Sequence, residues 1–139
     1  MINPEHQIGE QITYFEEPDI IYMKLIGTLQ EEDGLEVNRR HREFARGREH
    51  IFFLIDLSEL QSIHPVVRKA ATETLKEVPL RGIAVCQAPL KARVIAKLIT
   101  TALNMFKSDA AKNPVEFTDT EEAARTWIAA RRREILNAA

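Results

Sequence analysis

The chain has 139 residues, a formal net charge of -2 and a pI near 6.1, and this length suffices for one domain with a substantial core. A dedicated nucleic-acid binder usually carries a basic face, so this charge balance argues against nucleic acid as a partner. The single cysteine, Cys86, excludes an internal disulfide, and no apolar run approaches the roughly 18 to 20 residues that cross a bilayer. Residues 1–7 also lack the basic and apolar regions of a secretory signal, so we expect a soluble, cytoplasmic, single-domain protein over residues 1–139.

The N-terminal part of the chain predicts a loose lead-in over residues 1–7, followed by an antiparallel hairpin. Apolar and polar residues alternate over residues 8–15, a pattern typical of a half-exposed strand. Residues 16–19 indicate a turn, because proline fixes its own φ and aspartate favours turn geometry. A second strand is expected over residues 20–26 and should stop at Gly27.

Residues 30–47 form a charged segment that we interpret as a surface helix. Acidic residues come first and arginines come last, which suits the helix dipole. Gly34 weakens the first turn, and the apolar face is thin. The arginines could meet an anionic partner, but a solvated helix face is the favoured interpretation.

The stretch from Ile51 to Ile55 is the central strand of this prediction, and it ends at the carboxylate of Asp56. The run is too short for a typical helix and is rich in β-branched and aromatic residues, so it fits a strand buried on both faces. A polar loop over residues 57–64 is expected next, at the edge where open α/β folds place binding groups. Pro65 then opens a helix, because proline loses no hydrogen bond at the first helical position.

The second half of the chain alternates strands and helices. The pattern predicts helices over residues 65–78, 90–107 and from about 120 onward, strands over residues 80–86 and 115–117, and a tail at 136–139. Asp119 or Thr120 is expected to cap the last helix. The element order β-β-α-β-α-β-α-β-α indicates an α/β fold with a mixed, mostly parallel sheet and about four helices.

Several short motifs, in their order and spacing, resemble the STAS domain family, the fold of anti-sigma-factor antagonists. They are Leu54-Ile55-Asp56-Leu57-Ser58 with Ile63, Gly27-Thr28-Leu29, and Phe117-Thr118-Asp119-Thr120-Glu121-Glu122-Ala123 with Trp127. The resemblance runs from about Ile12 to Ile128 and is greatest to the small stand-alone SpoIIAA-like (STAS/Sec14-like) bacterial proteins. It implies a single-domain STAS-like fold with a binding or regulatory role.

The chain departs from the resemblance at the regulatory switch. In the signalling members of the family, a serine at the start of the helix after the central strand is phosphorylated and controls binding to a partner kinase. The matching positions here are His64, Pro65 and Val66, so no hydroxyl stands at the switch. A protein-interaction module that docks a partner through the loop, without a phosphoserine switch, is therefore the alternative function. Its candidate residues are Asp56, Ser58, Ser62, His64 and Val66.

No residue pattern in the chain points to catalysis, a cofactor or a metal. The phosphate-binding and dinucleotide-binding glycine motifs are absent, and the four histidines show no metal-ligand spacing with one another or with Cys86. Asp56, Ser62 and His64 flank one loop, but a solvated loop histidine is a better interpretation than a catalytic triad. Cys86 precedes a helix start that could lower its pKa, but a small buried apolar residue is the favoured interpretation. We therefore expect a non-enzymatic protein.

The helix expected over residues 90–107 carries the most informative pattern. At about 100° per residue, one apolar stripe should face the sheet, formed by Ala92, Ile95, Ala96, Ile99, Ala102, Leu103 and Phe106. The basic face of the helix includes Arg93, Lys97 and Lys107. Val94, Leu98 and Met105 belong to neither face, and they widen the apolar arc to about 200°, which is more than one buried face needs.

These three extra apolar residues require an explanation, because burying a large aliphatic side chain is worth roughly 1.5 to 3 kcal/mol. A neighbouring helix of the same chain, a second subunit in a homodimer, or an apolar ligand or membrane surface could cover them. The leading functional hypothesis is that a helix able to tilt off the sheet opens a pocket for an apolar small molecule or lipid, with peripheral docking on a membrane. The candidate residues are Val94, Ile95, Leu98, Ile99, Leu103 and Met105.

Overall fold

The computed structural model describes residues 3–138, which form one six-stranded sheet with the strands in sequence order. The strands are β1 (Gln7–Ile8), β2 (Gln11–Glu16), β3 (Ile20–Leu29), β4 (Ile51–Ile63), β5 (Leu80–Cys86) and β6 (Val115–Thr118). The first three strands are antiparallel neighbours, and β3 to β6 are parallel neighbours. The predicted α/β class and mixed, mostly parallel sheet are therefore confirmed, with β1 as one additional short strand.

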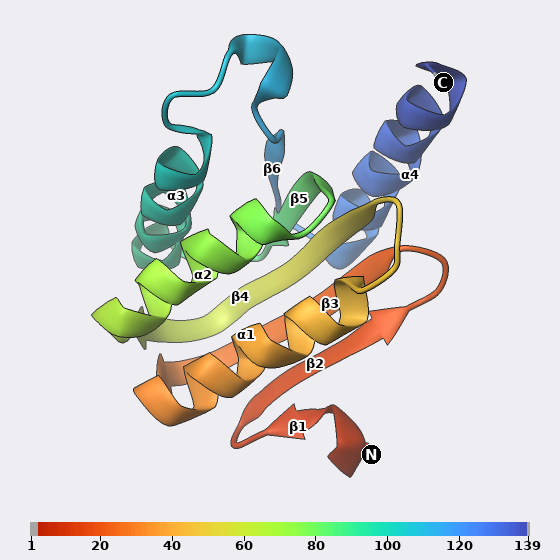
Figure 1. Ribbon diagram of the computed structural model, residues 1–139. Coiled ribbons are helices and arrows are strands. Elements are labelled where there is room, and N and C mark those ends of the chain that lie inside the picture. Colours follow the sequence, from red (N-terminus) through yellow and green to blue (C-terminus); the bar gives the residue numbers. More distant parts are fainter. Residues whose placement is uncertain (1–2, 139) are drawn as a thin grey trace.

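The helices are divided unequally between the two faces of the sheet (Figure 1). They are α1 (Glu31–Ala45), α2 (Pro65–Glu77), α3 (Leu90–Asn104) and α4 (Glu121–Ala138), with short 3-10 turns at Pro4–His6 and Asp109–Ala111. The first three connect neighbouring parallel strands, and crossovers of one hand along a sequential sheet place all of them on the same face. The fourth follows the edge strand β6 and packs on the opposite face.

The central strand is buried on both faces, as predicted. Ile51 and Phe53 belong to the core under α1, α2 and α3, whereas Phe52 and Leu54 belong to the core under α4. All four side chains are at most 1% exposed. Alternation along one strand thus supplies both cores, which explains the continuous apolar run in the sequence.

The predicted loop over residues 57–64 is wrong, because β4 continues through Ile63. Its partner β3 also continues, past Gly27 to Leu29, and the two strands pair with register shifts on either side of Gly27. Gly27 has a φ of +67°, so this glycine permits an irregularity within the strand and does not end it. The apolar side chains of Leu57 and Leu60, on the strand extension, are buried in the core.

Three boundaries at other places also differ from the prediction. A turn at Gly9, with a φ of +60°, divides the expected first strand into β1 and β2. The expected lead-in contains the turn Pro4–His6, and its first two residues lie outside the described part. The expected tail is helical through Ala138, and the hydroxyl of Thr120 caps α4 by accepting a hydrogen bond from Ala123 N at 3.0 Å.

The end of α3 lies earlier than expected, at Asn104. Met105 has extended backbone angles, and Phe106 has a φ of +67°, so neither continues the helix. The Phe106 side chain is 100% exposed, which corrects its predicted place on the stripe that faces the sheet. The chain then reaches β6 through the turn Asp109–Ala111.

Candidate functional site

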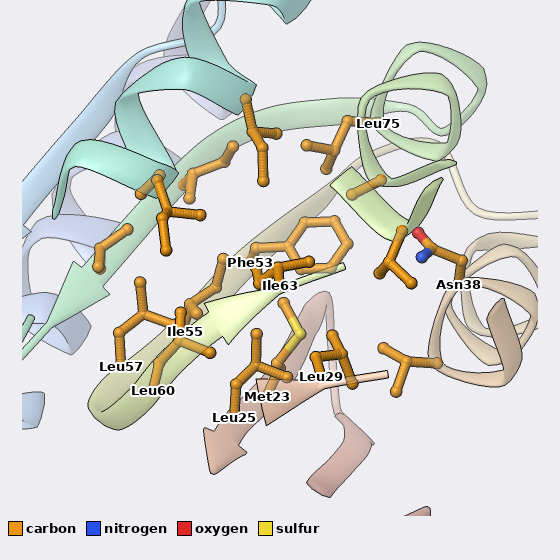
Figure 2. Close-up of a pocket in the computed structure, with 18 of the residues that line it drawn as sticks. Met23, Leu25, Leu29, Asn38, Phe53, Ile55, Leu57, Leu60, Ile63 and Leu75 are labelled. Atoms are coloured by element: carbon orange, nitrogen blue, oxygen red, sulfur yellow. The ribbon is translucent and has the colours of Figure 1, made fainter. Parts of the chain in front are cut away.

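An apolar cavity of about 90 Å³ lies between the sheet and the three helices of one face. Its floor includes Met23, Phe53 and Ile55 from β3 and β4, and Ile95 and Ile99 of α3 form part of its roof. Figure 2 shows the side chains of β3 and β4 rising into this space, with Leu57 and Leu60 together at the end away from α1. The cavity is thus built from the extension of β4 as well as from its central segment.

The cavity also has a polar end, formed by three buried side chains of α1 and α2. Asn38 is 5% exposed, His41 is 3% exposed and Thr74 is 1% exposed, and all three line the cavity. In Figure 2 the Asn38 amide points from α1 toward the cavity. The fourth polar lining residue, Thr100, lies on α3 and donates its hydroxyl hydrogen to Lys97 O.

The hydrogen bonds around His41 fix its tautomer. The Thr13 hydroxyl donates to Tyr22 O at 2.8 Å, and the same oxygen lies 2.9 Å from His41 Nε2. Since that hydroxyl has only one hydrogen, the contact requires Nε2–H of His41 as the donor, which leaves Nδ1 as an acceptor. Burial lowers the pKa of His41 from 6.5 to about 3, so the ring is neutral near pH 7.

The predicted apolar residues of the long helix do not lie together. Ile95 and Ile99 line the cavity, whereas Leu103 is 0% exposed in the core and is not among the lining residues. Val94, Leu98 and Met105 are on the outside, with exposed fractions of 51%, 55% and 53%. Within residues 3–138, the other helices therefore leave about half of each of these three side chains exposed.

The predicted basic face is only partly directed to solvent. Arg93 donates from Nε to Ala88 O at 3.1 Å, and its guanidinium lies 5.6 Å from the centre of the Phe117 ring. Lys97 Nζ lies 5.7 Å from the same ring centre. Lys107 is half-buried beyond the end of α3, in the loop that leads to β6.

No family model and no curated protein matches the chain. Among solved structures, it is similar to an uncharacterised DUF3478-family protein with a SpoIIAA-like fold from Shewanella loihica PV-4. The two share 18% identity with a TM-score of 0.60, over 84% of this chain and 90% of the other. The chain has a SpoIIAA-like fold. The resemblance stated from the sequence is confirmed at this level.

Within this SpoIIAA-like fold, the residues predicted for a partner loop are in regular structure and do not form a loop. Asp56 Oδ1 accepts from Ser58 N at 2.9 Å within β4, and Ser62 Oγ lies 3.0 Å from Thr28 Oγ1 across the β3–β4 pair. His64 caps α2, because its Nδ1 accepts from Val66 N at 3.1 Å. These roles spread the five residues along a strand and a helix start, and Val66 is 46% exposed.

Cys86 is buried within this SpoIIAA-like fold. Cys86 is 0% exposed, and burial, followed by the nearby charge of Asp56, raises the pKa of its thiol to about 11. The thiol is therefore protonated near pH 7, as the interpretation of a small buried residue expected. Across residues 3–138, no group of three or more His, Cys, Asp or Glu side chains could hold a metal ion. No helix in that part of the chain is long and apolar enough to cross a membrane.

The polar end of the cavity was not predicted from the sequence. Residues 30–47 were expected to form a solvated surface helix, but α1 buries one face, which is formed by Gly34, Val37, Asn38, His41 and Ala45. These uncharged residues recur at intervals of three and four among charged neighbours, which is the spacing of one helix face. That pattern was the available indication, but the polar character of Asn38 and His41 concealed it.

Proposed function

We propose that this SpoIIAA-like domain is a non-enzymatic binding module that holds an apolar small molecule or a lipid chain between α3 and the sheet. The observation that carries this proposal is the cavity, whose lining is almost entirely aliphatic and aromatic. Ligand sites are typically concave and apolar with a few polar groups that fix orientation, and the cavity has this composition. The SpoIIAA-like fold itself supports a binding or regulatory role.

The size of the cavity requires that α3 move outward when a ligand enters. An engineered cavity of about 150 Å³ is the size that accepts benzene, and the cavity here has about 90 Å³. None of the ion pairs among residues 3–138 involves α3, and its side-chain hydrogen bonds reach only neighbouring segments, at Ala88 and Asn113. Apolar contacts hold the helix on the strands of the cavity floor, and such contacts are non-directional, so no ion pair or side-chain hydrogen bond to these strands has to break when the helix shifts.

The outer side of α3 supports docking on a membrane surface. Leu90, Val94 and Leu98 recur at four-residue spacing and are 79%, 51% and 55% exposed. Leu98 also borders a shallow groove with Arg68 and Lys69 of α2. An exposed apolar strip beside cations is the combination by which an interfacial helix binds anionic lipid. A ligand could then pass between the bilayer and the cavity beneath the same helix.

Two substitutions on adjacent residues of α3 separate the two parts of this proposal. Ile99→Ser changes the cavity roof, and Leu98→Ser makes the same kind of change outside the cavity. The neutral fluorescent probe N-phenyl-1-naphthylamine should bind the wild type, and Ile99→Ser should weaken its binding by about tenfold, equivalent to about 1.4 kcal/mol. Leu98→Ser should keep probe binding but reduce co-sedimentation with vesicles of phosphatidylglycerol and phosphatidylcholine. Circular dichroism establishes that both variants are folded.

Three results would contradict the proposal. Equal probe binding by the wild type and Ile99→Ser would place the probe elsewhere, and no binding to the wild type would remove the ligand role. A concentration-dependent dimer in sedimentation velocity, lost in Leu98→Ser, would assign the outer strip to a second copy of the chain. In the last case the ligand site could stand, but the membrane part of the proposal would fall.

A further inference from the structure

We infer that the cavity selects ligands with a hydroxyl head group, which would bind the polar end formed by Asn38, His41 and Thr74 while an apolar chain lies along β4. This inference rests on the proposed function and specifies its ligand class. The three side chains are at most 5% exposed, come from two helices and line one cavity. Buried polar groups are normally hydrogen-bonded, and the Thr74 hydroxyl is buried with no partner among residues 3–138, while Asn38 and His41 each keep one acceptor unused.

Asn38 presents an acceptor to the cavity. Its Nδ2 donates to Gly34 O at 2.9 Å within α1, which fixes the orientation of the amide. No hydrogen bond from residues 3–138 reaches its Oδ1. The amide is directed toward the cavity, so the free oxygen lies where a ligand donor can reach it (Figure 2).

His41 provides a second acceptor one helical turn further along α1. Its Nε2–H is used by Thr13, and no hydrogen bond within the described residues involves Nδ1. Because the imidazole is neutral, the Nδ1 lone pair can accept a hydrogen bond. Residues Asn38 and His41 are separated by three positions and therefore lie on the same helix face.

Thr74 contributes the complementary group from α2. Its Oγ1 is buried and has no hydrogen-bond partner in the described part of the chain. A hydroxyl can donate one hydrogen bond and accept two, so it can donate to a ligand oxygen. Together the three side chains offer two acceptors and one donor. An alcohol carries one donor and an acceptor on one atom, so it can donate to either Asn38 or His41 while it accepts from Thr74.

The residues that line the cavity also disfavour ligands with charged head groups. Among the described residues, no Asp, Glu, Lys or Arg lines the cavity. An ionised carboxylate would face two acceptors without a cation, and an ammonium group would be buried without an anion, and both situations carry a large desolvation cost. An ether or hydrocarbon lacks the hydrogen that Asn38 and His41 can accept. The main rival occupant of the polar end is an ordered water, which also donates and accepts.

Displacement of N-phenyl-1-naphthylamine by four ten-carbon compounds tests the inference. The compounds are decan-1-ol, decyl methyl ether, decanoate at pH 8, and decane. The alcohol should bind about tenfold more tightly than the ether, since losing the donor leaves buried acceptors unpaired. Decanoate should bind more weakly than the alcohol. Asn38→Leu should reduce the preference of alcohol over ether without weakening ether binding, because only His41 then remains to accept from the hydroxyl.

A second variant keeps the test decisive if Asn38→Leu does not fold. Thr74→Val removes only an unpartnered hydroxyl at nearly constant shape, so folding should be preserved. It should weaken alcohol and ether by a similar factor of about three to ten, because both oxygens accept from Thr74. Equal binding of alcohol and ether to the wild type, unchanged in Thr74→Val, would overturn the hydroxyl inference and assign the polar end to water. Failure of all four compounds and of the probe would instead overturn the proposed function.

Discussion

The two faces of the sheet are held by different kinds of contact. On the α4 face, Arg132 makes two hydrogen bonds to Asp19, whose carboxylate is 3% exposed and also meets His50 Nε2 at 2.9 Å. Arg125 likewise joins Glu16 through two hydrogen bonds, at 2.6 and 3.0 Å. On the opposite face, α3 has no ion pair within residues 3–138 and closes a cavity with aliphatic side chains.

We expect this difference in contacts to make the α4 side of the molecule more rigid than the α3 side. Bidentate hydrogen bonds between arginine and carboxylate impose a specific geometry, and they fix α4 to the turn before β3. Aliphatic contacts have little directionality, so a helix held by them can shift while the sheet stays in place. In the proposed function, the α4 face is the support against which α3 would move.

The largest expected effect is on the α4 face. Arg132→Ala should lower the free energy of unfolding by about 3 kcal/mol, because it leaves Asp19 buried without its bidentate partner. Arg133→Ala, at the exposed neighbouring position, should change it by less than about 0.5 kcal/mol. Urea denaturation measures both values. Similar small losses in the two variants would show that the ion pair does not anchor α4.

The next effect concerns the pH dependence contributed by His41. Its pKa is lowered in the folded protein from 6.5 to about 3, so the unfolded chain binds more protons between these values. The His41 contribution to stability is fully present above pH 6.5 and is lost as the pH falls. The wild type should therefore lose on the order of 2 kcal/mol more than His41→Gln between pH 8 and pH 5. Parallel urea titrations at the two pH values measure this difference. Identical losses of unfolding free energy in the wild type and His41→Gln would mean that the pKa of His41 is not lowered in the folded protein.

The smallest effect should have the opposite sign. Ala96 lines the cavity, so Ala96→Leu should fill part of it and raise the free energy of unfolding by about 1 kcal/mol. The same variant should no longer bind N-phenyl-1-naphthylamine. Loss of binding in a more stable protein could not result from misfolding. A destabilised variant that still binds the probe would place the binding site outside the cavity.

Sequence patterns predicted the fold well wherever the type of a residue alone indicated its place in a strand or helix. The run Ile51 to Ile55 identified the central strand, and the alternation of strands and helices identified the parallel sheet. Prediction failed at Gly27, which was expected to end the strand, and the sequence pattern offered no reason for Gly34 in the first turn of its helix. Gly27 adopts a positive φ inside β3, and a Cβ at Gly34 would clash with the side chain of Val67 on α2. Neither the backbone angle at Gly27 nor the close approach of Gly34 to Val67 can be recognised before the three-dimensional arrangement of the elements is known.

Only the α3 side of the candidate site was predictable from the sequence. The helical stripe of Ile95 and Ile99 identified part of the cavity roof, since hydrophobic periodicity follows from helix geometry. The polar end depends on the depth at which Asn38 and His41 lie, and burial of polar residues has no periodic pattern of its own. Leu103 was expected on the stripe that faces the sheet and is buried, whereas the exposure of Leu98 depended on how α2 and α3 pack.

The sequential strand order has a consequence for the order in which the protein is synthesised. Asn38 and His41 leave the ribosome before β4, and α3 is the last wall of the cavity to emerge. A nascent chain that ends before Leu90 contains β1 to β5 and the polar end without the roof. Because contacts form between neighbouring segments as the chain lengthens, the floor can assemble before α3 exists. In the proposed function, biosynthesis would therefore give an apolar ligand one opportunity to enter the cavity without any opening of the finished fold.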